Sequence, residues 1–235
     1  MFKRFTRLSL RALLLLALVG AIVVAYWHRS SQRQKMLVEG IREYEGNVAY
    51  DWQIDFSKHD FIPNATPPYP NWLVDCFGED YFYSVHFAQV NLSQDPQKPI
   101  LQYGESLDEL NVIGGDPSRV FKTAYLPNLR RLEIWIDTPF DLSCVANLSA
   151  LEYLSIQSSE VSGLSTLKGL RNLRYLNLTT DAVESPELLG ELTQLTTLGI
   201  SPFQSDAEID QDMMDSIYAK LPNLKLPKIL LDRKK

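Results

Sequence analysis

The chain has 235 residues, of which 45% are hydrophobic, so it can bury one sizeable core or two small ones and lacks the composition of a disordered or fibrous protein. Residues 1–35 contain seven basic residues and no acid, which leaves 16 basic and 29 acidic residues, a formal net charge of −13, in residues 36–235. An acidic body of this size repels phosphate groups, so we expect no nucleic-acid partner.

The amino-terminal segment predicts that the chain is targeted to a membrane. Residues 1–7 form a short basic tail, and every residue from 12 to 26 is apolar or glycine, so residues 8–28 are predicted to cross a lipid bilayer as a helix. A signal peptide cleaved after Ala25 is the alternative. Tyr26 and Trp27 favour an uncleaved anchor, because aromatic rings suit the membrane interface.

The orientation of this span follows from its flanks. Four basic residues precede the apolar stretch 12–26 and three follow it within residues 1–35, which favours a cytoplasmic amino terminus. We therefore expect a single-pass membrane protein whose remaining residues lie outside the cytoplasm.

A pattern L-x-x-L-x-L recurs behind the span with a constant period. Its middle leucines are each 22 residues apart: Leu110, Leu132, Leu154, Leu176 and Leu198. Phe87, Val90 and Leu92 form a weaker copy ahead of the series, at a spacing of 20.

The period has a direct structural meaning. An L-x-L pair is typical of a short strand with both side chains on one side, and leucines at three-residue spacing, such as Leu164 and Leu167, indicate a tight 3₁₀ or helical return. One unit cannot bury its apolar side chains alone, so we expect the units to stack into an α/β solenoid with short parallel strands on one face.

The unit that contains Leu148, Leu151, Leu154 and Ile156 resembles the leucine-rich repeat of the internalin type. The resemblance covers about residues 85–231, and it implies the solenoid fold while saying little about the ligand. The position usually held by asparagine in the turn is different here: Gly115, Asp137, Ser159, Asp181 and Phe203. The layout as a whole is similar to bacterial membrane-anchored leucine-rich-repeat proteins, many of which have no assigned function.

An open stack needs covers at both ends. Residues 29–84 are predicted to form a linker helix and an amino-terminal cap, with a helix over 31–46, a strand over 48–54, a proline-rich loop over 58–70 and a short helix from Trp72 that Gly78 ends. The repeats are expected to occupy residues 85–203.

Residues 204–235 are predicted to form a carboxy-terminal capping repeat. Ser205 and Glu208 make a capping box, and a helix with one apolar face follows it: Ile209, Met213, Ile217 and Leu221. A closing segment with Leu224, Leu226, Ile229 and Leu230 precedes a basic tail.

Few residues suggest chemistry, and we expect neither an enzyme nor a cofactor. Cys76 and Cys144 are predicted to be small buried side chains, with a single disulfide as the alternative. The acidic run over 206–215 lacks the glycine of a calcium loop, so no metal site is expected. A hydrolase with a catalytic site built from Cys76 and His86 is the alternative hypothesis to a non-catalytic protein.

Strand alternation indicates where a ligand would bind. If Leu132 and Ile134 face the core, the neighbouring odd-numbered residues face outward, and Arg131, Tyr153 and Tyr175 fall into one column. Exposed aromatic residues beside arginine are typical of binding hot spots. The candidate set is Arg131, Glu133, Trp135, Tyr153, Gln157, Tyr175 and Asn177. Alternatively, Tyr153 and Tyr175 pack on each other as a cross-strand ladder and only cover the sheet.

These observations predict a membrane-anchored leucine-rich-repeat protein that binds a protein or peptide through its strand-lined face. A structural envelope protein that associates with itself is one alternative, and a cleaved, secreted binding protein is another.

Overall fold

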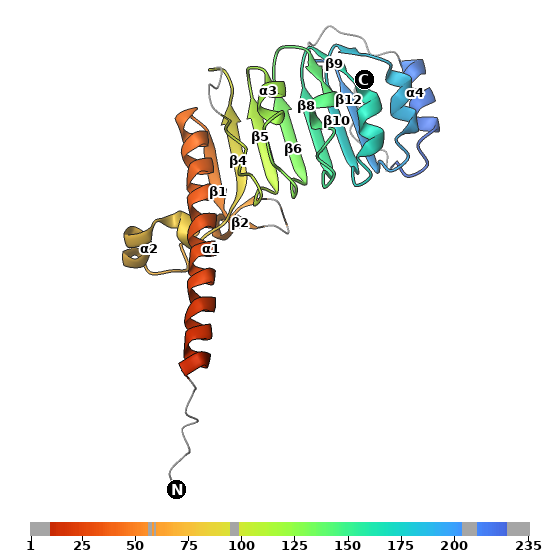
Figure 1. Ribbon diagram of the computed structural model, residues 1–235. Helices are drawn as coiled ribbons and strands as arrows, with labels where there is room; N and C mark the ends of the chain where they lie inside the picture. Colours follow the sequence, from red (N-terminus) through yellow and green to blue (C-terminus); the bar gives the residue numbers. More distant parts are fainter. Residues whose placement is uncertain (1–9, 56–57, 59, 95–98, 204–210, 225–235) are drawn as a thin grey trace.

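The computed structural model describes residues 10–55, 58, 60–94, 99–203 and 211–224 (Figure 1). The predicted capping box of Ser205 and Glu208 lies outside the described residues. So do Ile209 and the closing segment beyond Leu224.

The chain begins with one continuous helix, α1 (Leu10–Glu43), of 34 residues. Its amino-terminal half is apolar, exposed, and long enough to cross a membrane, a property shared by anchors and signal sequences. Its carboxy-terminal half is amphipathic, and Leu37, Val38 and Ile41 are buried against the end of the sheet. Figure 1 shows α1 standing across that end, with its apolar half extending away from the body.

The main sheet has seven strands in the order β1-β4-β5-β6-β8-β10-β12. Their bounds are β1 (Asn47–Tyr50), β4 (Val85–Asn91), β5 (Glu109–Ile113), β6 (Arg131–Trp135), β8 (Tyr153–Gln157), β10 (Tyr175–Thr179) and β12 (Thr197–Ser201). Within this sheet β1 and β4 pair antiparallel; from β4 to β12 every pair is parallel, and each residue faces the residue 22 positions further along. The predicted α/β class with parallel strands on one face is observed.

The core is built from columns of residues at the same period. The central column consists of Ala88, Leu110, Leu132, Leu154, Leu176 and Leu198, and every member has 0% exposure. Complete burial of one leucine side chain stabilises a fold by about 1.5–3 kcal/mol. The strict period therefore produces a continuous apolar core along the whole stack.

Short helical returns carry the chain back behind the sheet, as the three-residue leucine spacing predicted. They are α3 (Pro117–Phe121), η3 (Leu142–Val145), η4 (Leu164–Gly169) and η5 (Pro186–Glu191). A second parallel sheet joins β7 (Phe140–Asp141), β9 (Glu160–Ser162) and β11 (Ala182–Val183). The last helix, α4 (Gln211–Ala219), contacts η5 and includes buried Ile217.

The predicted first repeat was wrong by two residues. Ala88 pairs with Leu110 and Val90 pairs with Val112, so the first copy of the pattern is Val85, Ala88 and Val90 at the full period of 22. Phe87 consequently faces outward instead of into the core, since side chains alternate along a strand. The small side chain of Ala88 concealed the true register.

Two buried hydroxyls lie one position before the asparagine position of the turn, those of Ser158 and Thr180. At the asparagine position itself, the Asp181 carboxylate accepts from the amide of Phe203 at 3.0 Å. The Ser158 hydroxyl donates to the carbonyl of Glu160 at 2.7 Å, and the Thr180 hydroxyl donates to that of Ala182 at 2.9 Å. These hydroxyls satisfy turn carbonyls where an asparagine would otherwise act.

The amino-terminal cap contains more and shorter secondary-structure elements than predicted. The strand expected over 48–54 stops at Tyr50 and gives way to η1 (Asp51–Gln53) and β2 (Ile54–Asp55), which pairs with β3 (Asp60–Phe61) inside the expected loop. The amide of Asp51 donates to the carbonyl of Ser84 instead of continuing the ladder. The helix α2 (Asn71–Phe77) ends at Gly78, as predicted, and η2 (Glu79–Tyr81) follows.

The prediction that both cysteines are buried was wrong for Cys76, which is exposed on α2. Cys144 on η3 is partly buried against the core, and both thiols are free. Cys76 is therefore not a core residue, and no disulfide links the cap to the repeats.

Candidate binding surface

The outer face of the sheet is ordered into columns that run across the strands. One column contains Phe87, Glu109, Arg131, Tyr153, Tyr175 and Thr197. The next contains Gln89, Asn111, Glu133, Ser155, Asn177 and Gly199. The predicted alignment of Arg131, Tyr153 and Tyr175 is confirmed, because the 22-residue period sets the register.

Three side chains of the first column stack on one another. The rings of Tyr153 and Tyr175 lie 4.2 Å apart at an angle of 8°, and the Arg131 guanidinium lies 3.7 Å from the centre of the Tyr153 ring. The arginine donates from Nε and Nη2 to one carboxylate oxygen of Glu133, at 3.1 and 2.6 Å. The ladder interpretation of the two tyrosines is thus the observed geometry.

Electrostatics fix the arginine in this position. Burial opposes its charge, yet the hydrogen bond and charge of Glu133, together with the neighbouring Tyr153 and Glu109, raise the pKa of Arg131. In Tyr153 burial raises the pKa to about 12, although the Arg131 charge opposes the shift. Arg131 is therefore a preorganised cation, held before any partner arrives.

The remaining predicted residues lie further along the strands. Trp135 is 43% exposed at the opposite end of β6 from Arg131, and Gln157 lies beside it in register. Asn177 lies in the middle column, where its amide donates to the Ser155 hydroxyl at 3.4 Å. The predicted set is thus divided into three parts. Arg131, Tyr153 and Tyr175, with Glu133 bonded to Arg131, form what we call the Arg131 stack. Asn177 lies in the middle column, and Trp135 and Gln157 form a separate pair at the far strand ends.

A groove of about 300 Å³ opens on this face beside the cap. The β2–β3 hairpin forms one wall and the first three parallel strands form the floor, with these lining residues: Ile54, Asp60, Phe61, Phe87, Gln89, Glu109, Asn111, Arg131 and Glu133. Phe61 meets Phe87 edge to face with ring centres 5.4 Å apart. The apolar wall and polar floor have the composition of a ligand pocket.

The groove carries an excess of negative charge. Its lining includes Asp60, Glu109 and Glu133 but a single base, Arg131, which is bonded to Glu133. Two formal negative charges remain beside two phenylalanine rings. Carboxylates and aromatic faces both attract cations, so this lining suits a positively charged group.

Most of these lining residues were missed in the sequence. Glu109 and Asn111 could have been found by extending the alternation rule one strand earlier. Phe87 was placed in the core by the wrong register, and the hairpin residues Asp60 and Phe61 lie in a segment predicted as loop. Their approach to the sheet depends on the tertiary fold of the cap, which no local pattern encodes.

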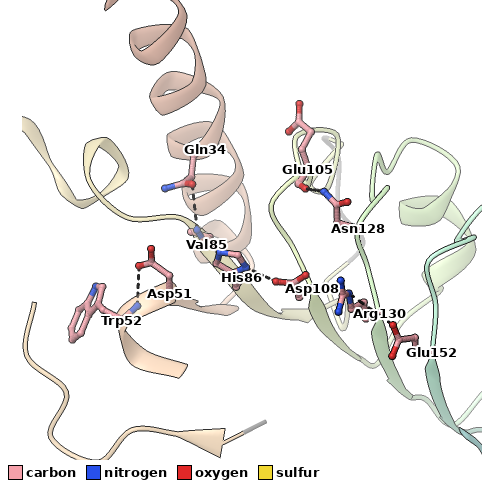
Figure 2. Close-up of polar contacts among 10 residues, drawn as sticks. All are labelled: Gln34, Asp51, Trp52, Val85, His86, Glu105, Asp108, Asn128, Arg130 and Glu152. Carbon is pink, nitrogen blue, oxygen red and sulfur yellow. Dashed lines mark hydrogen bonds and ion pairs between the residues drawn. The ribbon is translucent and has the colours of Figure 1, made fainter. Parts of the chain in front are cut away.

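A third column, at the amino-terminal ends of the strands, contains His86, the residue considered above for a hydrolase site. His86 bonds to Asp108 through Nδ1, and Arg130 lies 4.0 Å from Glu152 (Figure 2). These four residues and Arg174 recur every 22 positions with alternating character. His86 therefore belongs to a ladder of polar pairs, while Cys76 lies on α2 in the cap.

Within the described part of the chain, no group of three or more His, Cys, Asp or Glu side chains is arranged to hold a metal ion. In the acidic run, Asp206, Glu208 and Asp210 lie outside that part.

Comparisons with known proteins give matches among solved structures. No family model matches the chain, and no curated protein matches it. Among solved structures it is similar to internalin C2 from Listeria monocytogenes, with 24% identity and a TM-score of 0.31, over 53% of this chain and 62% of that one. The chain thus spans less than two thirds of that structure.

Proposed function

We propose that this chain is a membrane-anchored leucine-rich-repeat solenoid that binds a protein or peptide segment across its strand-lined face. The groove beside the β2–β3 hairpin carries the proposal, because it is a hollow of about 300 Å³ at one end of an ordered, outward-facing array of side chains. Residue pairing at a period of 22 through six strands supports the solenoid. The exposed apolar half of α1 supports the anchor over a cleaved signal, since the same helix continues into the core at Leu37 and Ile41.

The groove defines the chemistry of the partner. Two of its carboxylates, Asp60 and Glu109, lie with the rings of Phe61 and Phe87 around one hollow. A lysine or arginine side chain fits both features, because its charge meets the carboxylates while its apolar stem packs on the rings. We therefore propose that a basic residue of the partner enters the groove, and that the adjacent segment crosses the Arg131 stack.

A random peptide library displayed on phage tests this proposal against the full-length chain in lipid nanodiscs. Enriched peptides are expected to contain lysine or arginine at a fixed position. Their affinity should fall at least tenfold for the double variant Asp60→Asn and Glu109→Gln, because the groove then loses two of its three negative charges.

The matched control is Glu160→Gln, which removes an exposed carboxylate from β9 in the second sheet. This variant should bind the same peptides as the native chain. Enrichment without basic residues, or equal loss in the groove and control variants, would contradict the proposal.

A further inference from the structure

We propose that residues 71–81, which include α2 and η2, lie on the surface of the membrane with their exposed aromatic side chains in the headgroup layer of the bilayer. This proposal rests on the anchoring of the chain by α1 and adds a second, peripheral attachment that the spanning helix does not imply.

The segment is fixed to α1 where the apolar span ends. The Tyr81 hydroxyl and the His28 ring nitrogen are 2.9 Å apart, and the rings of Tyr81 and Trp27 have centres 6.1 Å apart. About two helical turns further on, the Gln34 amide donates to the carbonyl of Tyr83 at 2.6 Å and to the carboxylate of Asp80 at 3.4 Å. Figure 1 shows α2 beside the middle of α1, between its apolar half and the half that packs on the sheet.

The length of the span sets the height of the membrane surface. A hydrocarbon layer of about 30 Å takes about 20 helical residues at about 1.5 Å each. Every residue from Ala12 to Trp27 is apolar or glycine, and Leu8 and Leu10 extend the stretch to about that length, because a long arginine side chain such as that of Arg11 extends toward the headgroups. Trp27 and His28 therefore fall in the headgroup layer, and Tyr81, which contacts both, falls there with them.

The side chains of this segment match that environment. Trp72 is 67% exposed, Phe77 is 58% exposed, and Tyr69 just before α2 is 46% exposed. Large aromatic rings gathered in water form an interaction patch, whereas in the interface they are favoured. The exposed carboxylate of Asp75 on the same helix opposes deeper insertion, so the segment lies on the membrane and does not enter it.

A hollow beside the same turns of α1 also lies at the level expected for the headgroup layer. It has a volume of about 210 Å³, and its lining includes Tyr26, Arg29, Ser30, Arg33 and Tyr103. Arg33 also meets Glu105 at 3.4 Å. Guanidinium and hydroxyl groups at the end of a membrane span suit the phosphate of a lipid headgroup.

The two attachments together determine how the repeats are presented. α1 stays helical from the span into the core, where Leu37 and Ile41 are buried, and the strands stack away from it sideways (Figure 1). With α2 resting on the lipid, rotation of the body about the axis of α1 is restricted. The binding face is then held at a fixed orientation above the membrane.

Spin labels on the full-length chain in phosphatidylcholine vesicles test this proposal. In a Cys144→Ser chain the label sits on Cys76, one helical turn after Trp72 on the same face of α2. Two reference chains lack both native cysteines and carry Val23→Cys within the span or Gln157→Cys on the distant sheet face. Collisions with oxygen report contact with lipid, and collisions with a water-soluble nickel chelate report contact with water.

The Cys76 label is expected to be shielded from nickel severalfold relative to the Gln157→Cys label. The changes Trp72→Ser and Phe77→Ser should remove that shielding while leaving the Val23→Cys label unchanged. If the Cys76 label is as accessible to nickel as the Gln157→Cys label while the Val23→Cys label is in lipid, the proposed position of residues 71–81 on the membrane surface is wrong and the anchor stands. If the Val23→Cys label is also in water, both the anchor and the membrane-surface position are wrong.

Discussion

Tyr153 and Tyr175 stack with parallel rings 4.2 Å apart, although they are 22 residues apart in the chain. Residues that face each other across parallel strands project side by side, and here the period of the repeat brings two aromatic rings into that relation. Arg131 continues the stack onto the neighbouring strand. The contact therefore reports on the register of three successive repeats.

The stack should appear as a coupling energy between its members. Tyr153→Ala and Tyr175→Ala, made singly and together, are expected to be non-additive by about 0.5–1.5 kcal/mol, the value of an aromatic pair beyond its buried area. Urea unfolding of the four chains in detergent measures this coupling. Additive losses would show that the rings do not stabilise each other.

The first repeat offers a test of register. Ala88→Leu should destabilise the chain by about 1–3 kcal/mol, because Ala88 is fully buried in the central column. Phe87→Ala should cost less than the about 3–5 kcal/mol of a core phenylalanine, because its ring faces the groove. A loss of about 3–5 kcal/mol for Phe87→Ala, with no loss for Ala88→Leu, in thermal or urea unfolding would restore the register with a spacing of 20.

The central column should be intolerant of truncation. Leu154→Ala is expected to lower the free energy of unfolding by about 2–5 kcal/mol, since it leaves a cavity in a column with no exposed surface. Gln157→Ala, on the exposed end of the same strand, should change it by less than about 0.5 kcal/mol. Equal losses for the two variants would contradict the assignment of inner and outer positions.

The Cys144 thiol should react only slowly with disulfide reagents in the folded chain. Burial and, to a smaller degree, the charge of Asp141 raise the pKa of its thiol to about 12, so only about one molecule in ten thousand carries the reactive thiolate at about pH 8. In a Cys76→Ser chain, the rate of reaction with a disulfide reagent is expected to rise at least a hundredfold when urea unfolds the repeats. A rise of less than tenfold would show that the thiol is already accessible.

The sequence predicted what depends on period and alternation. The spacing from Leu110 to Leu198 was sufficient for the parallel sheet, its register and the column of Arg131, Tyr153 and Tyr175, because each repeat contacts its neighbours in the same way. Gly78 was correctly identified as the end of α2 because only the local chain is involved.

The parts that failed depend on contacts outside the period. Ala88 occupies a core position, but its side chain is too small to match the leucine pattern. The β2–β3 hairpin reaches the sheet only through the fold of the cap. Ser158 and Thr180 bind turn carbonyls from one position before the asparagine position, which the repeat pattern does not mark. The groove lies between the first repeats and the β2–β3 hairpin, so sequence reasoning found two of its lining residues, Arg131 and Glu133, and not the hollow itself.

The most direct test of the proposed function is site-specific photocrosslinking in intact membranes of the source cell. A photoreactive benzoylphenylalanine replaces Asn111 on the floor of the groove, or Ser165 on η4 behind the sheet. We predict that a defined protein crosslinks from position 111 and not from 165, and that mass spectrometry places the crosslink next to a lysine or arginine of that protein. Crosslinks of equal yield from both positions, or none from position 111, would contradict binding at the strand-lined face.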